Sequence, residues 1–141
     1  MKKWTYFTLR EMIHSDTAER NNLKNLPDGA ALNNLDTLVR KVLDPLREYY
    51  GEPIKVTSGY RSRKLNQLVK GVKNSQHCIG QAADLQPLKI YDWDKFLKSV
   101  VEWCKENEFD QCIIEKNGTT RWVHISYRQG SNRRKIFRMV I

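Results

Sequence analysis

The sequence contains few cysteines, few histidines and no long hydrophobic run. The three cysteines form no Cys-x-x-Cys pair, and this odd number does not indicate a disulfide framework. No apolar stretch approaches the ~20 residues needed to cross a bilayer, so we expect no membrane insertion. Thr8, Arg10 and Glu11 interrupt any hydrophobic segment after the basic N-terminus. We therefore expect no signal peptide and synthesis in the cytoplasm, with another exit route for any action outside the cell.

Acidic residues are also in the minority, with 16 Asp and Glu against 25 Lys and Arg, and the net charge is +9. Such an excess is typical of proteins with an anionic partner, such as nucleic acid or a bacterial cell wall, but it also fits an ordinary solvated surface. The sequence shows neither the interleaved aromatic and basic residues of single-strand binders nor helix-turn-helix or zinc-finger spacing. No nucleic-acid partner is therefore expected. One basic cluster comprises Arg128, Arg133, Arg134, Lys135 and Arg138.

With 141 residues and 40% hydrophobic content, the chain is expected to form one domain over residues 1–141, and a monomer is the default expectation. Apolar residues at helical spacing predict a long helix after Asp28, kinked near Pro45 and closed by Gly51. Helices precede most strands along the chain, which predicts an α+β fold with an antiparallel sheet and helices packed on one side. The other predicted elements are helices at 9–14, 62–70 and 93–107 and strands at 54–58, 82–85, 111–115, 121–127 and 135–141.

Two of the three histidines lie in short motifs that could bind a metal. His77 precedes Asp84 by seven residues, and His124 lies in a predicted strand. Two imidazoles and one carboxylate are usual ligands of a catalytic zinc, with a fourth position left for water. Such a site activates water near neutral pH and polarises a carbonyl. Lone histidines and aspartates are more often core or capping residues, so spacing alone leaves both interpretations open, and Cys78 is a further, weaker ligand candidate.

Taken together, the motifs resemble those of the zinc peptidoglycan peptidases. That family includes D-alanyl-D-alanine carboxypeptidases and dipeptidases and many phage endolysins, and the N-terminal stretch is similar to the small phage-type branch. The resemblance covers most of the chain. It is carried by Ser-Gly-Tyr-Arg-Ser at 58–62, Ser75-x-His77-x-x-Gly80-x-Ala82-x-Asp84, Trp122-x-His124, and the stretches 7–12 and 109–111.

The resemblance implies a zinc DD-peptidase (Hedgehog-like) fold and a role for each motif residue. His77, Asp84 and His124 would bind Zn²⁺. Arg61 would bind the substrate carbonyl or carboxylate and stabilise the charge of the tetrahedral intermediate, although a surface salt bridge is an alternative. Ser75 would hydrogen-bond the peptide terminus, unless it serves only as a capping hydroxyl.

The implied activity is hydrolysis of a peptide bond in peptidoglycan stem peptides, of either the D-Ala-D-Ala carboxypeptidase or the L-Ala-D-Glu endopeptidase type. A cell-wall substrate without a secretion signal suggests a phage lysin released through a membrane lesion, or a prophage copy. The alternative is a cell-wall peptide-binding module that retains the zinc fold but is catalytically weak or inactive.

One departure from the family pattern concerns the catalytic carboxylate. Relatives commonly place it three residues before the last histidine, where this chain has Arg121, which cannot act as a base. We expect Glu115 to act as general base and acid, taking a proton from water and passing it to the leaving amine. Its alternative role is an ion pair with Arg121 or Lys116. Asp110 and Glu108 are weaker candidates for the base.

The role of Glu115 depends on the register of the predicted hairpin. If Glu115 pairs with Arg121, its side chain points away from the face that carries His124, whereas a one-residue shift places both on the same face. The predicted five-residue loop at 116–120 leaves both registers possible.

Overall fold

The computed structural model describes residues 4–141. Within this range no helix is both long and apolar enough to cross a membrane. The helical segments are α1 (Leu9–Ile13), α2 (Asp16–Arg20), α3 (Gly29–Leu38), the π-helical η1 (Val39–Leu43), α4 (Asp44–Tyr50), α5 (Arg63–Leu68), η2 (Gln76–Ile79), η3 (Ile90–Asp92) and α6 (Trp93–Glu106). The strands are β1 (Ile54–Ser58), β2 (Ala82–Pro87), β3 (Gln111–Asn117), β4 (Thr120–Ser126) and β5 (Lys135–Val140).

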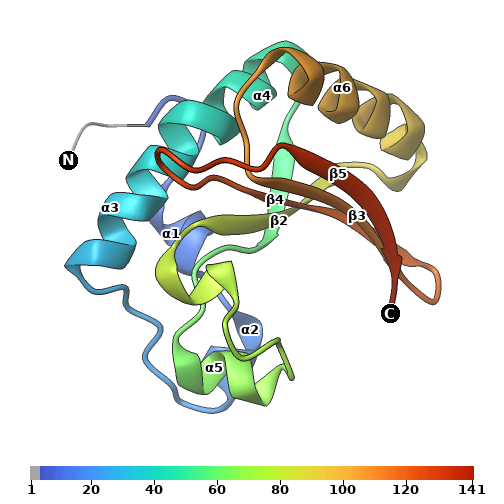
Figure 1. Cartoon of the computed structure of the whole chain (residues 1–141). Helices are drawn as coiled ribbons and strands as arrows, with labels where there is room; N and C mark the ends of the chain where they lie inside the picture. The colour runs from blue at the N-terminus through green and yellow to red at the C-terminus, as the bar shows by residue number, and fades with distance from the viewer. Residues whose placement is uncertain (1–3) are drawn as a thin grey trace.

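The strands form one sheet in the order β1-β2-β4-β3-β5, and α3, α4 and α6 lie along one side of it (Figure 1). The predicted α+β fold is confirmed. The sheet is mixed rather than wholly antiparallel, because β5 pairs in parallel with β3. Two arginines hold the chain where it enters β5. Arg133 pairs with the buried Asp110 just before β3, and Arg134 donates to the Lys105 carbonyl near the end of α6.

The long predicted helix forms as three consecutive segments, α3, η1 and α4. Pro45 lies in the first turn of α4 and follows the π-helical turn. A proline lacks the backbone N–H and crowds the carbonyl four residues earlier, and the wider π turn accommodates both effects. Gly51 ends the helix in the left-handed conformation at φ +82°.

The hydrophobic core lies between these helices and one face of the sheet. On β2 and β4 the residues that alternate with the core residues face the opposite side, which we call the site face. Asp84 and His124 lie on the site face. The core-facing residues of the sheet are Ala83, Leu85, Cys112, Val123 and Ile125, and they pack with Leu35, Leu38, Val42, Leu46, Phe96 and Val100 of the helices.

Candidate metal centre

His77 is positioned by a short helical turn between α5 and β2. The hydroxyl of Ser75 caps this turn by accepting a hydrogen bond from the His77 backbone N–H at 3.1 Å. The buried His77 ring places Nδ1 2.7 Å from the carbonyl oxygen of Gly59. Because a carbonyl only accepts, Nδ1 carries the proton in the neutral ring and Nε2 is left with its lone pair free to bind a metal.

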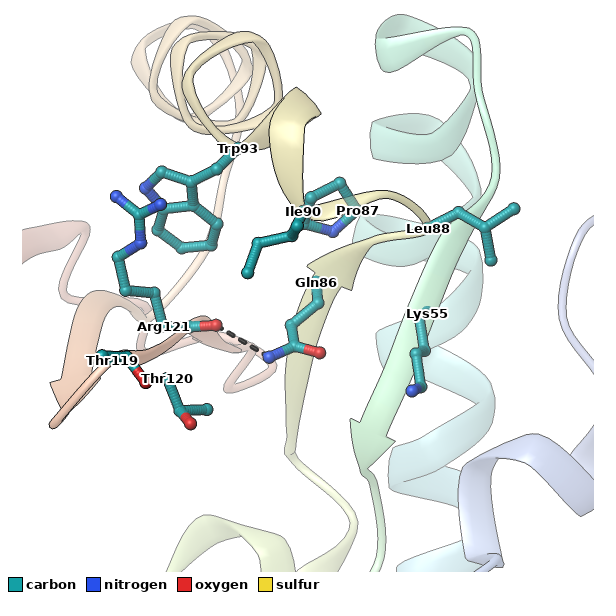
Figure 2. A pocket seen from close by; sticks show the side chains of 9 residues that line it. All are labelled: Lys55, Gln86, Pro87, Leu88, Ile90, Trp93, Thr119, Thr120 and Arg121. Atoms are coloured by element: carbon teal, nitrogen blue, oxygen red, sulfur yellow. Dashed lines mark hydrogen bonds between the residues drawn. The ribbon is translucent and has the colours of Figure 1, made fainter.

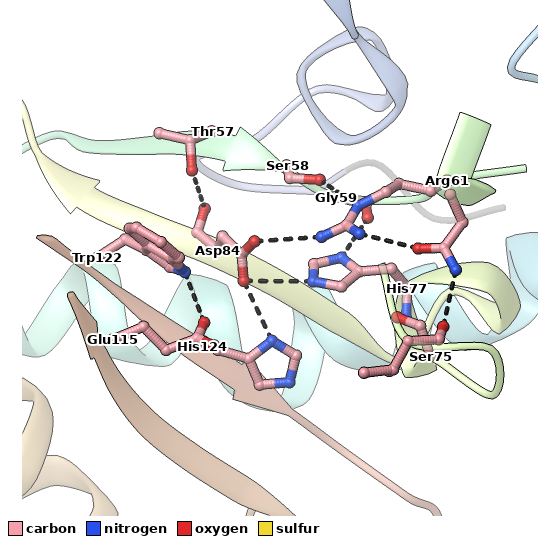
Figure 3. A network of polar contacts seen from close by, with 12 residues as sticks. Thr57, Ser58, Gly59, Arg61, Ser75, His77, Asp84, Glu115, Trp122 and His124 are labelled. Carbon is pink, nitrogen blue, oxygen red and sulfur yellow. Dashed lines mark hydrogen bonds and ion pairs between the residues drawn. The ribbon is translucent and has the colours of Figure 1, made fainter. Parts of the chain in front are cut away.

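Asp84 and His124 are brought together by the antiparallel pairing of β2 and β4, in which they are direct partners. One carboxylate oxygen of Asp84, Oδ1, lies 3.2 Å from His77 Nε2 and 3.1 Å from His124 Nδ1 (Figure 3). One ligand atom from each of the three residues lies within 4.8 Å of the other two. The structure therefore gathers the three predicted ligands at one point, and Cys78 is not part of the group.

The chemistry of this donor set fits a zinc ion. The lone pair of His77 Nε2 and the carboxylate of Asp84 point toward one another in a largely buried site, which favours a cation between them. Burial alone would raise the pKa of the Asp84 carboxyl, but His77 and His124 hold it well below its ordinary value. Two imidazole nitrogens and an ionised carboxylate are the protein ligands of zinc sites that keep an open position.

Glu115 lies on the same face of the sheet as His124. Glu115 pairs with Trp122, and Ile113 pairs with His124. This register differs by one residue from a direct Glu115–Arg121 pairing. It arises because Asn117 still pairs with Thr120, which leaves only Gly118 and Thr119 in the turn, with Gly118 at φ +62°. The predicted five-residue loop is wrong, and the tighter turn places the carboxylate on the site face.

The surroundings of Glu115 suit proton transfer. Burial of the half-buried side chain and the nearby charge of Asp84 raise the pKa of the Glu115 carboxyl, and the opposing influence of His124 is smaller. The indole Nε1 of Trp122 donates to Glu115 Oε2 at 2.5 Å, which orients the carboxylate. A carboxylate with a raised pKa exchanges protons more readily near neutral pH. The predicted alternative, an ion pair with Arg121 or Lys116, does not form among residues 4–141.

Comparison with known protein families gives one result. The Peptidase M15 family model matches residues 5–126, a span that contains the three clustered ligand candidates, Arg61 and Glu115. The chain belongs to the peptidase M15 family. This membership makes it a zinc metallopeptidase, as the donor set also indicates. A comparison with curated proteins found no match.

Arg61 lies at the edge of the metal cluster of this M15 peptidase. Its guanidinium donates to Ser58 Oγ at 2.9 Å, to Asn66 Oδ1 at 2.9 Å and to Asp84 Oδ2 at 3.4 Å. Because an arginine side chain has five N–H groups, two remain for a substrate oxygen. Arg61 does form an ion pair, with Asp84, but its side chain is only 15% exposed, so the pair is largely buried rather than at the surface.

Two residues that support Arg61 escaped the sequence analysis. Asn66 is buried on α5, and its amide Nδ2 donates to the Val72 carbonyl at 2.8 Å, which turns its oxygen toward Arg61. A Cβ atom at Gly71 would lie 2.0 Å from that oxygen and 2.8 Å from Arg61 Nη1. Any side chain at position 71 would therefore displace Asn66 or Arg61. No sequence pattern marks the role of Asn66 and Gly71 beside Arg61, because it depends on how the chain returns past Arg61 after α5.

The remaining candidates have structural contacts. Ser75 caps the turn that carries His77, and its predicted contact with the peptide terminus stays a prediction. Asp110 is buried and paired with Arg133, so it is not available as the base of this peptidase. Arg121 points to the opposite face from His124 and lies over the Trp93 ring at 5.0 Å.

Proposed function

We propose that this M15 peptidase hydrolyses a peptide bond in the stem peptides of bacterial peptidoglycan, with His77, Asp84 and His124 as its zinc ligands. One observation carries the proposal. Arg61 and Glu115 lie on opposite sides of the three converging ligand atoms, on the open face of the sheet (Figure 3). A scissile carbonyl at the cluster would thus have a fixed cation on one side and a carboxylate on the other.

Each group would have a distinct task in the reaction. Zinc, when bound, supplies a Lewis acid that polarises the carbonyl and lowers the pKa of water. Arg61 would donate its free N–H groups to the carbonyl oxygen as negative charge develops there. Glu115 would accept a proton from the attacking water and deliver it to the leaving amine, while Trp122 holds its carboxylate in place.

Peptidoglycan as the substrate is supported by the motifs at 58–62, 75–84 and 122–124 and by the net charge of +9, which suits an anionic wall. The cleaved bond would be either D-Ala-D-Ala or L-Ala-D-Glu. We further propose that the protein acts as a monomeric single domain on the cell wall, in the manner of a phage lysin.

The test is digestion of purified sacculi and defined stem peptides, with products identified by mass spectrometry. We expect either free D-alanine or cleavage between L-Ala and D-Glu, loss of activity on chelation and recovery with zinc. Intact stem peptides after long incubation of the zinc-loaded protein would overturn the proposed activity. Binding of wall fragments under those conditions would identify the non-catalytic binding module instead.

The assignment of the base has its own test. Glu115→Gln should keep its zinc and lose about 10²- to 10⁴-fold in kcat, the usual contribution of a general base. Glu108→Gln is the matched control, because Glu108 is an exposed carboxylate nearby in the chain. If Glu115→Gln kept full activity while His124→Ala lost it, Glu115 would not be the base.

A further inference from the structure

A cavity lies where β2 and β4 separate. Their ladder ends at the pair Leu85–Val123, and beyond it the side-chain amide of Gln86 donates to the Arg121 carbonyl at 2.8 Å across the gap. The cavity has a volume of about 290 Å³ and is bordered by β1, β2, β4 and the first residue of α6 (Figure 2). Its lining includes none of the three residues of the metal cluster.

The charged groups that line this cavity are all cations. Lys55 and Arg121 line it, no carboxylate of the described chain does, and neither cation takes part in a salt bridge within residues 4–141. Trp93 is buried and supports the Arg121 guanidinium from one side at 5.0 Å (Figure 2). A stacked arginine is pre-oriented and keeps its N–H edge free, which suits a planar anion such as a carboxylate.

The cavity occupies the gap between β2 and β4 at the end of the site face. Lys55, Gln86 and Thr120 border it from the site face, and Arg121 and Trp93 border it from the opposite face. Gln86 follows Asp84 by two residues on β2, Lys55 is the strand partner of Gln86, and Thr120 precedes His124 by four residues on β4. At ~3.3 Å per residue the cavity begins about 7 Å from the metal cluster. Trp122 lies on the same face between the two sites. A peptide extended along this face would reach the cavity two or three residues from the cleaved bond.

We propose that this cavity is a distal subsite that binds a carboxylate carried by the substrate two or three residues from the scissile bond. A carboxylate that enters the gap would be bound by Lys55 from the site face and by Arg121 from the opposite face, and the exposed Leu88 and Ile90 at the rim would contact the aliphatic part of the same residue. The inference rests on the proposed function. A glutamate of a stem peptide has this chemistry, with a free carboxylate beyond a short aliphatic chain.

The test is a double-mutant cycle between protein and substrate. Defined peptides carry a carboxylate or the matching amide at one position at a time, on either side of the cleaved bond. The assay compares the wild-type protein with Arg121→Gln, Lys55→Gln and Lys98→Gln. Lys98 is an exposed lysine on α6, so its substitution removes the same charge outside the cavity. At one position the amide should lower the wild-type kcat/KM about tenfold, the size expected for loss of one charge-assisted contact.

The variants distinguish a subsite from a general charge effect. Arg121→Gln should cleave the carboxylate peptide about tenfold more slowly and the amide peptide at the wild-type rate, Lys55→Gln should show a smaller loss of the same kind, and Lys98→Gln should match the wild type. The ratio of the wild-type kcat/KM values for the carboxylate and amide peptides should fall as the salt concentration rises. Equal kcat/KM for carboxylate and amide at every position would overturn the proposal, as would equal losses for both peptides in Arg121→Gln.

A binding measurement separates this proposal from the proposed function. Calorimetric titration of Glu115→Gln with the two peptides should show about tenfold tighter binding of the carboxylate form, and the added Arg121→Gln change should remove the difference. If the wild type cleaved no peptide, the proposed function would fail while this titration still decided the subsite. Arg121→Lys, which keeps the charge, should recover part of the preference and provides a second folded variant for the test.

Discussion

Among residues 4–141, two clusters bring histidine and carboxylate side chains together, and they differ in burial and in the hydrogen bonds around them. The first is His77, Asp84 and His124, and the second is His14, Asp16 and Glu19. In the second cluster His14 lies 3.0 Å from Asp16 Oδ1 and 3.5 Å from Glu19 Oε1, but its three side chains are 47%, 78% and 69% exposed. All three belong to one short stretch around α2.

The first cluster is assembled from distant parts of the chain and is largely buried. The side chains of its members are 3–13% exposed, and His77 is oriented through Nδ1 by the carbonyl of Gly59. Ligand atoms lie within 4.8 Å of one another in both clusters, so proximity does not distinguish them. Burial and outer hydrogen bonds do, because they fix which atoms are free and exclude water that would compete with a metal. The exposed cluster is an ordinary surface ion-pair group of small energetic value.

The largest expected effect, on zinc content and activity, comes from removing one histidine from each cluster in turn. His124→Ala should remove bound zinc and abolish peptide hydrolysis, because it takes away one of three ligands. His14→Ala should leave one zinc per chain and normal activity. Elemental analysis of the purified variants and the peptide assay measure both. Zinc loss from His14→Ala, or full zinc content in His124→Ala, would reverse the comparison.

The support around Arg61 gives the second largest effect. Gly71→Ala should displace Asn66 and Arg61 and lower kcat/KM about tenfold to a hundredfold with zinc content unchanged, because misplaced transition-state contacts are costly. Gly29→Ala is the matched control, since a Cβ there meets no atom within 4 Å. Asn66→Ala should show a loss similar to that of Gly71→Ala. Normal activity in both variants would mean that Arg61 needs no such positioning.

Two polar contacts extend the comparison of buried and exposed groups to protein stability. One is the pair of Arg133 with the buried Asp110, and the other is the exposed contact of His14 with Asp16. Arg133→Gln leaves the buried Asp110 carboxylate without its charged partner, although Gln76 and the backbone N–H of residue 133 still donate to it. The change should lower the free energy of unfolding by about 1–2 kcal/mol, reduced from the fully buried case because Arg133 is 41% exposed. His14→Gln at the exposed cluster should change it by less than about 0.5 kcal/mol. Chemical denaturation at neutral pH measures both.

The pH dependence of the Arg133 effect has a definite sign. Burial would raise the pKa of the Asp110 carboxyl, but hydrogen bonds from Arg133 and Gln76 hold it below its ordinary value. A lowered pKa in the folded state contributes stability above the unfolded-state pKa of about 3.9, and this contribution disappears as the pH falls through the folded value. The free energy of unfolding of the wild type should therefore exceed that of Arg133→Gln by the largest amount at neutral pH, and this excess should decrease below about pH 4. A constant difference would contradict it.

The smallest effect concerns the pH profile of the reaction. Trp122→Phe removes the indole donor that favours the ionised form of Glu115, so the pKa of the Glu115 carboxyl should rise further. The acidic limb of the kcat/KM profile should move to higher pH, with a loss of no more than about tenfold at neutral pH. Zinc content should not change. A limb that stayed in place would show that Glu115 does not control it.

Local patterns predicted much of the fold. Apolar residues at helical spacing predicted the helices in 29–51 and 93–107, and alternating apolar residues predicted the strands, because these are the periods of the two structures. The elements formed near the expected bounds. The short helix α2 was not predicted. The parallel placement of β5 was not expected, because it depends on contacts of Arg133 and Arg134 with distant residues.

Residue types and short spacings alone were enough to identify His77, Asp84 and His124 as candidates, because zinc requires those donor groups whatever the fold. Whether Glu115 faces them was decided only by the tertiary structure, since a turn shorter by three residues shifts the pairing and each one-residue shift exchanges the two faces of a strand. The cation-lined cavity around Arg121 likewise exists only because segments far apart in the chain pack together. The contact of Asn66 with Arg61 spans five residues, but it too depends on the folded path of the chain, which returns past the pair at Gly71.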